Sequence, residues 1–137
     1  MEAEIAELMA RLVRAWNAHD VEAIAACYAS DYIGEDVAQA RPLCGSHAAR
    51  VAAADYLRAF PDLQITGETL IEDKRVALVW MLRGTHQGPL LRVPPSGRAI
   101  AVRGVSVLTV QGGHITRGVS VWDVAGFLRA IGLLPAL

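Results

Sequence analysis

The stretch AIAVRGVSVLTVQGGHITRGVSVW, residues 99–122, has two runs rich in β-branched residues on either side of Gln111-Gly112-Gly113. Valine, isoleucine and threonine favour strands, and paired glycines favour a tight turn. The stretch therefore predicts an antiparallel hairpin with strands at 99–110 and 114–122.

A second pair of strands is predicted immediately before this hairpin. Residues 63–71 and 76–86 are β-rich and flank the short polar turn 72–75, and the proline-containing loop 87–97 leads into the next strand. No helical segment lies between these runs, so we expect consecutive antiparallel strands without crossover connections.

Helices are predicted on both sides of the strand region. Asp20 is the expected cap of a second helix that follows the first, and Ser46 that of a third, which Pro61 ends. A last helix is expected at 124–131, and the segment 30–45 reads as a loop. The residues expected to face inward are Ile5, Leu8, Met9, Leu12, Val13 and Trp16 in the first helix, Ile24, Cys27 and Tyr28 in the second, Val51, Ala54, Leu57 and Phe60 in the third, and Phe127, Leu128 and Ile131 in the last.

Helices followed by hairpins predict an α+β fold, with the N-terminal helices packed on a strongly curved antiparallel sheet that encloses a pocket. The 137 residues suit one domain, 1–137, and the hydrophobic fraction of 53% indicates a lined cavity, a subunit interface or both.

Charge and cysteine usage exclude several function classes. Thirteen basic residues balance fourteen acidic ones, which disfavours nucleic acid and anionic membranes as partners. Charged residues interrupt the apolar N-terminus and no later run is long enough to span a membrane, so we expect a cytoplasmic protein. Its cysteines, Cys27 and Cys44, would then be reduced thiols, and no histidine pairing suggests a metal site.

The motifs of cofactor enzymes and nucleophilic hydrolases are missing. The sequence has no glycine-rich dinucleotide fingerprint, P-loop, nucleophile elbow or zinc-protease helix. We therefore expect acid/base chemistry by carboxylate and imidazole groups in a dry pocket, without a cofactor.

Asp123 is the first candidate for this chemistry. Two-residue periodicity from Ile115 would place Val119, Val121 and Asp123 on one inward face of the last strand. Burial would raise the pKa of the carboxyl group toward neutrality. The alternative is a simple N-cap of the last helix, in which helix amides would lower that pKa.

His86 is the second candidate, because it ends a strand face that is otherwise apolar from Val76 to Leu82. An imidazole facing the pocket could relay a proton or donate to an enolate oxygen. The alternative is a histidine at the hairpin end that is solvated or bonded to the backbone. The residues expected to line the pocket and bind substrate are Trp16, Tyr28, Tyr32, Trp80, Ser106, Val119 and Val121. The strand parity of Trp122 places it behind the pocket or against a partner, and that of Arg103 places it on the outside.

Several motifs together resemble the SnoaL-like polyketide cyclases of the NTF2-like superfamily. They are WNAHD at 16–20, FPDL at 60–63, RGTHQG at 83–88, PPSGR at 94–98 and WDVAG at 122–126. The resemblance covers nearly the whole chain and implies a cone-shaped fold. It also implies that Asp123 shuttles the proton in an intramolecular aldol closure, and it strengthens the interpretation of His86.

The function that the resemblance implies is cofactor-independent ring closure of a hydrophobic, polyketide-derived substrate. Relatives on this scaffold leave alternatives open: a hydroxylase, an epoxide hydrolase, a ketosteroid-isomerase-type enzyme, or a ligand-binding module without catalysis. A homodimer is expected through the convex face of the sheet.

Overall fold

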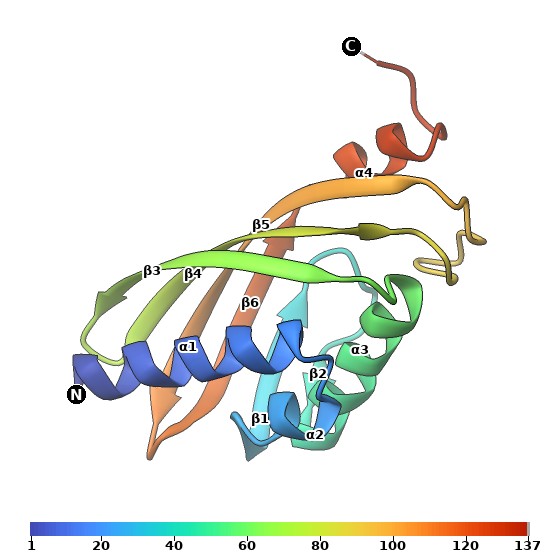
Figure 1. Ribbon diagram of the computed structural model, residues 1–137. Coiled ribbons are helices and arrows are strands. Elements are labelled where there is room, and N and C mark those ends of the chain that lie inside the picture. The colour runs from blue at the N-terminus through green and yellow to red at the C-terminus, as the bar shows by residue number, and fades with distance from the viewer. Residues whose placement is uncertain (137) are drawn as a thin grey trace.

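The computed structural model describes residues 1–136 and has the predicted α+β architecture (Figure 1). The second predicted helix is shorter than expected, and the segment 30–45 contains strands. The elements in chain order are α1 (Glu2–Asn17), α2 (Val21–Ala25), β1 (Tyr28–Asp36), β2 (Leu43–Cys44), α3 (Gly45–Ala59), β3 (Gln64–Glu72), β4 (Arg75–Thr85), β5 (Ala99–Gln111), β6 (His114–Trp122) and α4 (Val124–Ala130).

The six strands form one sheet in the order β2-β1-β6-β5-β4-β3. The four strands β3 to β6 are consecutive antiparallel neighbours, as the sequence predicts. The prediction of a purely antiparallel sheet is wrong, because β1 lies parallel to β6. β1 and β6 lie side by side (Figure 1), which places the first strand of the chain next to the last.

A β-bulge in β6 decides which of its residues face the interior. Ile115 pairs with Val110 and Arg117 pairs with Thr109, so Thr116 is an extra residue in β6. One inserted residue shifts the two-residue alternation of everything that follows. The side chains of Ser120 and Trp122 therefore face inward.

The predicted parity of the last strand is consequently wrong. Val119 and Val121 are 43% and 53% exposed, whereas Trp122 is 9% exposed. The expectations for β4 and β5 hold, because those strands pair with regular register: Leu78 and Val102 are buried, and Arg103 is exposed.

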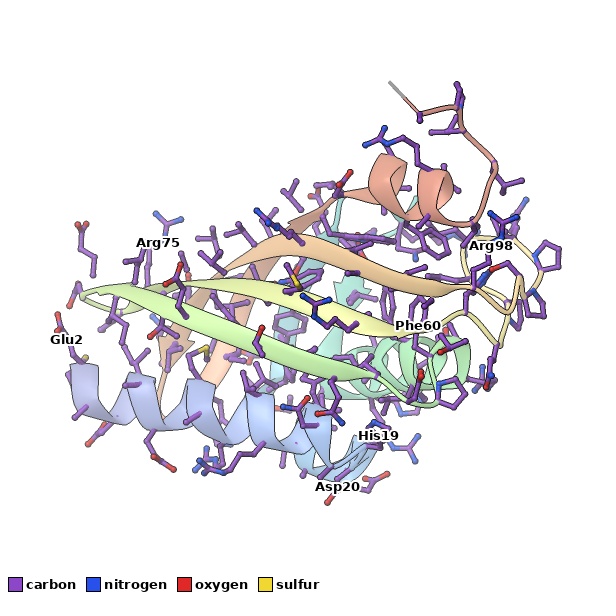
Figure 2. All side chains as sticks on the ribbon, turned by 45° about the horizontal axis from the view of Figure 1, so that its top comes forward. Glu2, His19, Asp20, Phe60, Arg75 and Arg98 are labelled. Atoms are coloured by element: carbon purple, nitrogen blue, oxygen red, sulfur yellow. The ribbon has the colours of Figure 1, made fainter. Side chains whose placement is uncertain are left out.

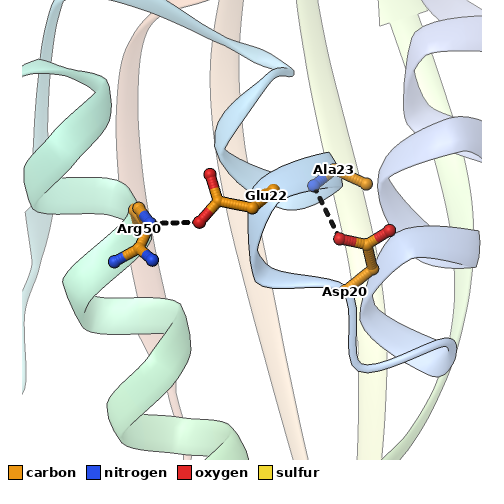
Figure 3. Close-up of polar contacts among 4 residues, drawn as sticks. All are labelled: Asp20, Glu22, Ala23 and Arg50. Carbon is orange, nitrogen blue, oxygen red and sulfur yellow. Dashed lines mark hydrogen bonds and ion pairs between the residues drawn. The ribbon is translucent and has the colours of Figure 1, made fainter.

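The N-terminal helices are joined to each other and to the sheet by short polar contacts. Asp20 caps α2, as predicted, by accepting a hydrogen bond from the Ala23 amide at 3.0 Å, and Glu22 pairs with Arg50 of α3 (Figure 3). The Asn17 side chain donates to the Ile65 carbonyl at 2.9 Å and accepts from its amide at 2.6 Å. The end of α1 is thus fixed to the edge strand β3.

Two details of the predicted α3 are wrong. The helix begins at Gly45 rather than after Ser46, and its N-cap residue, Cys44, makes no side-chain capping bond. Val51 is 43% exposed, because the buried stripe of α3 consists of the small residues Ala49, Ala53 and Ala59. Small side chains let α3 lie close to β1. Because alanines are only weakly apolar, the buried stripe of α3 is hard to recognise in the sequence.

The core consists of two apolar clusters. One lies between α1, α2 and the strands and contains Leu8, Met9 and Ile115, and the other lies under α4 and contains Phe60 and Phe127. Arg75 and Phe60 lie toward opposite ends of the sheet (Figure 2). Trp16 and Trp80 pack against both clusters, so the region between them is walled by aromatic rings. Among residues 1–136, no helix combines the length and the apolar character that a membrane span needs.

We predict that Gly104→Ala destabilises the protein by about 1–3 kcal/mol, the usual range for overpacking. Gly104 pairs with Trp80 across β4 and β5, and a Cβ at this position would overlap the indole ring. The same substitution in a Trp80→Phe background should cost less, because phenylalanine lacks the overlapping atoms. Urea unfolding of the four proteins of this double-mutant cycle measures the coupling; equal costs in both backgrounds would contradict the packing argument.

Candidate functional site

A cavity of about 140 Å³ lies between the two core clusters. An engineered cavity of about 150 Å³ in another protein holds benzene, so this one has room for about one six-membered ring. Its wall is mainly apolar and combines residues from α1, α3 and five strands. The lining residues are Leu12, Val13, Trp16, Tyr28, Tyr32, Asp36, Tyr56, Phe60, Ile65, Leu78, Trp80, Leu82, Val102, Ser106, Leu108, Ser120 and Trp122.

Aromatic side chains dominate the wall. Tyr28 and Tyr32 meet edge to face with ring centroids 4.8 Å apart, and Tyr56 meets Trp122 at 6.2 Å. Burial raises the pKa of Tyr28, so its hydroxyl stays protonated and available as a donor. Such a surface suits a flat apolar ligand with a few polar groups.

Asp36 supplies the one carboxylate that lines the cavity within the described residues 1–136. Its Oδ2 accepts a hydrogen bond from the Tyr56 hydroxyl at 2.7 Å. Its Oδ1 accepts from the indole Nε1 of Trp122 at 3.2 Å and from the Ala38 amide at 2.9 Å. An oxygen of a carboxylate can accept two hydrogen bonds, so Oδ2 keeps capacity for a proton from a ligand.

Tyr56 is held as a donor to this carboxylate. Burial, reinforced by the hydrogen bond to Asp36 and its negative charge, raises the pKa of the phenol. Tyr56 comes from α3, Trp122 from the end of β6 and Asp36 from the end of β1. Three elements distant in sequence therefore meet at one acid group.

Two serines form a second polar group in the wall. The Trp80 indole donates to Ser106 Oγ at 3.1 Å, and Ser106 Oγ lies 2.7 Å from Ser120 Oγ. Both hydroxyls line the cavity.

Comparison with known proteins identifies the family. The sequence profile of the SnoaL-like polyketide cyclases matches residues 6–131, which is nearly the whole chain. The chain belongs to the SnoaL-like polyketide cyclase family.

Solved structures agree with this family and with its NTF2-like fold. AclR from Streptomyces galilaeus, provisionally assigned as a hydroxylase, is 28% identical with a TM-score of 0.86, over 100% of this chain and 90% of its own. TsrD from Streptomyces laurentii is 22% identical with a TM-score of 0.88, over 98% of each chain. A protein from Jannaschia sp. CCS1, provisionally assigned as a SnoaL-like polyketide cyclase, is 23% identical with a TM-score of 0.86, over 97% of this chain and 94% of its own. No curated protein matches this chain.

The structure brings five of the seven predicted pocket residues of this SnoaL-like chain together in the cavity wall. They are Trp16, Tyr28, Tyr32, Trp80 and Ser106. Val119 and Val121 lie on the opposite face of the sheet, and Trp122 lines the cavity although its parity predicted the outside. The bulge at Thr116 accounts for all three errors.

Asp123 does not line the cavity, and its predicted inward orientation is wrong. The bulge turns it outward, where it is exposed and caps α4 by accepting a hydrogen bond from the Gly126 amide at 2.8 Å. This is the alternative that the sequence left open.

His86 is fully buried, yet it also lies outside the cavity wall. Its ring packs against Phe127 and Phe60, with centroids 5.1 and 6.0 Å away. Nδ1 lies 2.9 Å from Ser96 Oγ and accepts from the Ser96 amide at 3.2 Å, so the proton of the neutral ring is on Nε2. Nε2 has no hydrogen-bond partner among the described residues. The imidazole thus holds the 87–97 loop through Ser96. His86 therefore fits the alternative of a histidine bonded to the backbone better than the prediction of a pocket residue.

Asp36 was missed because its segment was interpreted as a loop. Ser30, Asp31, Gly34 and Glu35 have low strand propensity, and nothing in one sequence shows that Tyr56 and Trp122 converge on Asp36. Among residues 1–136, no group of three or more His, Cys, Asp or Glu side chains is arranged to hold a metal ion.

We predict that His86 makes stability fall at mildly acidic pH. Burial lowers its pKa from the ordinary value of about 6.5, so the unfolded chain binds more protons below that pH. Its contribution is complete above pH 6.5 and is lost as the pH falls from there toward the folded-state pKa. Urea unfolding between pH 5 and 8 should show a smaller loss of stability at low pH in His86→Asn than in wild type. The amide oxygen of the asparagine can still accept a hydrogen bond from Ser96. His47→Asn, at an exposed site, is the control, and equal pH profiles for wild type and His86→Asn would contradict this account.

Proposed function

We propose that this chain is a cofactor-independent enzyme that performs acid/base chemistry on a carbonyl compound, with intramolecular aldol ring closure of a polyketide-derived substrate as the reaction. The observation that carries the proposal is the carboxylate of Asp36 in the wall of a mainly apolar cavity, held by three hydrogen-bond donors. Family membership supports the reaction class.

The chemistry needs one proton acceptor that later returns its proton. Asp36 takes a proton from the carbon next to a substrate carbonyl, and the electron pair of the broken C–H bond forms the enolate. The enolate carbon then attacks a second carbonyl of the same molecule, forming the new C–C bond. The resulting alkoxide receives the proton from Asp36, so atoms and charge balance without another reactant.

Tyr56 and Trp122 act as positioning residues in this proposal. They hold both carboxylate oxygens of this cavity-lining residue, and Oδ2 accepts one hydrogen bond where it can accept two. Holding two reacting carbons together in the cavity contributes up to about 7–11 kcal/mol in favourable cases, and one acid/base group contributes about 10²- to 10⁴-fold. We assign the proton transfer to Asp36 rather than to Asp123 or His86, because neither of those side chains lines the cavity.

A hydroxylase is the second candidate function. The observation in its favour is the similarity to AclR, provisionally assigned as a hydroxylase, at 28% identity over the whole chain. Mass spectrometry separates the two, because hydroxylation adds an oxygen atom to the product and ring closure by aldol addition leaves the mass unchanged.

We predict that Asp36→Asn slows enolisation by about 10²- to 10⁴-fold. Cyclohexanone is a suitable probe because it matches the one-ring size of the cavity. Proton NMR in deuterium oxide measures the exchange of the hydrogens next to its carbonyl, with wild type faster than the variant. Asparagine keeps the shape of Asp36 and still accepts from Trp122 and Ala38, so the fold should survive.

Asp123→Asn is the matched control, because asparagine is an equally good helix N-cap and this side chain is exposed. It should exchange cyclohexanone at the wild-type rate. If Asp123→Asn lost the exchange activity while Asp36→Asn kept the wild-type rate, the acid/base role would return to Asp123. No exchange by wild type, with cyclohexanone bound, would favour a ligand-binding module.

We also propose a homodimer through the outer face of the sheet. This face exposes apolar side chains on the neighbouring strands β1, β6 and β5, and a contiguous exposed apolar patch commonly marks a protein–protein contact. Its exposed members are Ile33, Val105, Val119 and Val121.

We predict that Val119→Glu converts a dimer to a monomer, as measured by sedimentation velocity at micromolar concentration. Val51→Glu is the matched control, because Val51 lies on α3 and both valines are 43% exposed. It should leave the dimer intact. A monomeric wild type would contradict the proposal.

A further inference from the structure

Three polar side chains form a row across the concave face of the sheet. Asp36 of β1 is the register partner of Ser120 in β6, and Ser120 is the partner of Ser106 in β5. Neighbouring strands are about 4.8 Å apart, so each hydroxyl is one strand further from the carboxylate. All three side chains line the cavity, whose remaining wall is mainly apolar or aromatic.

The hydrogen bonds of this row leave one hydroxyl hydrogen without an acceptor. The Trp80 indole is only a donor, so Ser106 Oγ accepts from it. Between Ser106 and Ser120, one hydroxyl donates to the other. Whichever does so, the hydrogen of the other hydroxyl is free, because neither serine side chain has another hydrogen-bond partner within residues 1–136.

We propose that the Ser106–Ser120 pair binds the carbonyl oxygen of the ligand. The two serines are half-buried in a mainly apolar cavity, where a donor without an acceptor is unfavourable and a carbonyl oxygen would supply the acceptor. Trp80 strengthens the donor, because a hydroxyl that already accepts a hydrogen bond is polarised. The ligand is therefore a ketone or related carbonyl compound whose oxygen meets the serines.

The position of the pair has a consequence for chemistry, and this step rests on the proposed role of Asp36. A carbonyl oxygen and the hydrogen-bearing carbon beside it are two bonds apart, and Ser120 and Asp36 are adjacent in the row. An oxygen held by the serines places that carbon toward Asp36. When the proton leaves, negative charge grows on the oxygen that the hydroxyl already faces, so the same contact strengthens in the transition state.

The test uses binding rather than turnover. Cyclohexanone labelled with ¹³C at the carbonyl and methylenecyclohexane have nearly the same shape, but only the ketone accepts a hydrogen bond. The ratio of ketone affinity to alkene affinity should be about three- to tenfold higher in wild type than in a variant without these donors, the value of one ordinary hydrogen bond. The ¹³C carbonyl resonance of the bound ketone should lie at higher chemical shift than in cyclohexane, the sign of an accepted hydrogen bond.

The hydrogen count makes a specific prediction for variants. Ser106→Ala and Ser120→Ala each leave one hydroxyl that can donate to the ligand, so each keeps most of the ¹³C shift. Ser106→Ala also frees the indole N–H of Trp80, which lines the cavity, so the decisive protein is the triple variant Trp80→Phe/Ser106→Ala/Ser120→Ala. It should lose the shift, and its ratio of ketone to alkene affinity should fall relative to Trp80→Phe alone, which keeps both hydroxyls and should keep the shift. Thr66→Ala, which removes an exposed hydroxyl from β3, is the control.

Three outcomes overturn the proposal: a ¹³C shift that persists in a folded triple variant, equal affinity ratios in Trp80→Phe and the triple variant, or a wild type that does not bind the ketone. Ser120→Thr keeps a hydroxyl and should keep the shift, so loss of the shift in this variant also contradicts the proposal if the triple variant does not fold. The proposed function fails separately. If wild type did not exchange the ketone hydrogens but the ¹³C shift depended on the serines, only the role of Asp36 would be removed. If wild type exchanged them and the ¹³C shift did not depend on the serines, only the role of the serines would be removed.

Discussion

The extra residue in β6 is the constraint on which the site depends. Because Thr116 is inserted opposite the Thr109–Val110 step, the rest of β6 is turned by one residue relative to β5. That turn brings Trp122 to Asp36 and Ser120 to Ser106. Without it, two valines would face the cavity and both polar contacts would be lost. A local irregularity of this kind commonly re-aims a side chain at a functional site.

The cavity exists because large aromatic side chains of the sheet pack over glycines at neighbouring positions. Trp80 lies over Gly104, and Tyr32 lies over Gly34, where any Cβ would overlap the ring. Large rings over glycines build walls without filling the centre. The packing that makes the interior dense elsewhere thus leaves a ring-sized space here, lined by residues that belong to both core clusters.

The sequence predicts the parts of the fold that follow from local periodicity. The α1 stripe and the four strands from β3 to β6 are correct to within one residue or two, because their patterns are strong and their turns are marked by charged, glycine or proline residues. The strand β1 is different. Its partner β6 is about 80 residues away, and its polar residues give it no recognisable strand pattern in the sequence. Asp36 lies in that strand, so the missed strand and the missed carboxylate are one error.

The error at Asp123 has a separate cause, because the alternation rule is sound but the bulge interrupts it. Five of the seven predicted pocket residues do not depend on the register of β6, and all five line the cavity. The two that do depend on it, Val119 and Val121, are the two that fail. Sequence patterns therefore located the aromatic wall, which hydrophobic burial dictates, but could not locate its polar groups, which depend on the registers of β1 and β6.

Asp36 links the stability of the fold to the chemistry proposed for it. A carboxylate in an apolar wall is costly unless donors surround it, and here the donors come from α3, from β6 and from the turn after β1. Two of these bonds, from Tyr56 and Trp122, tie α3 and the end of β6 to β1, so they contribute to the closure of the cavity as well as to the orientation of the carboxylate. The arrangement satisfies most of the acceptor capacity of Asp36, yet it leaves one acceptor site on Oδ2 of this cavity-lining residue. A carboxylate that was only structural would gain from a fourth donor; the absence of one among the described residues leaves that site to whatever the cavity binds.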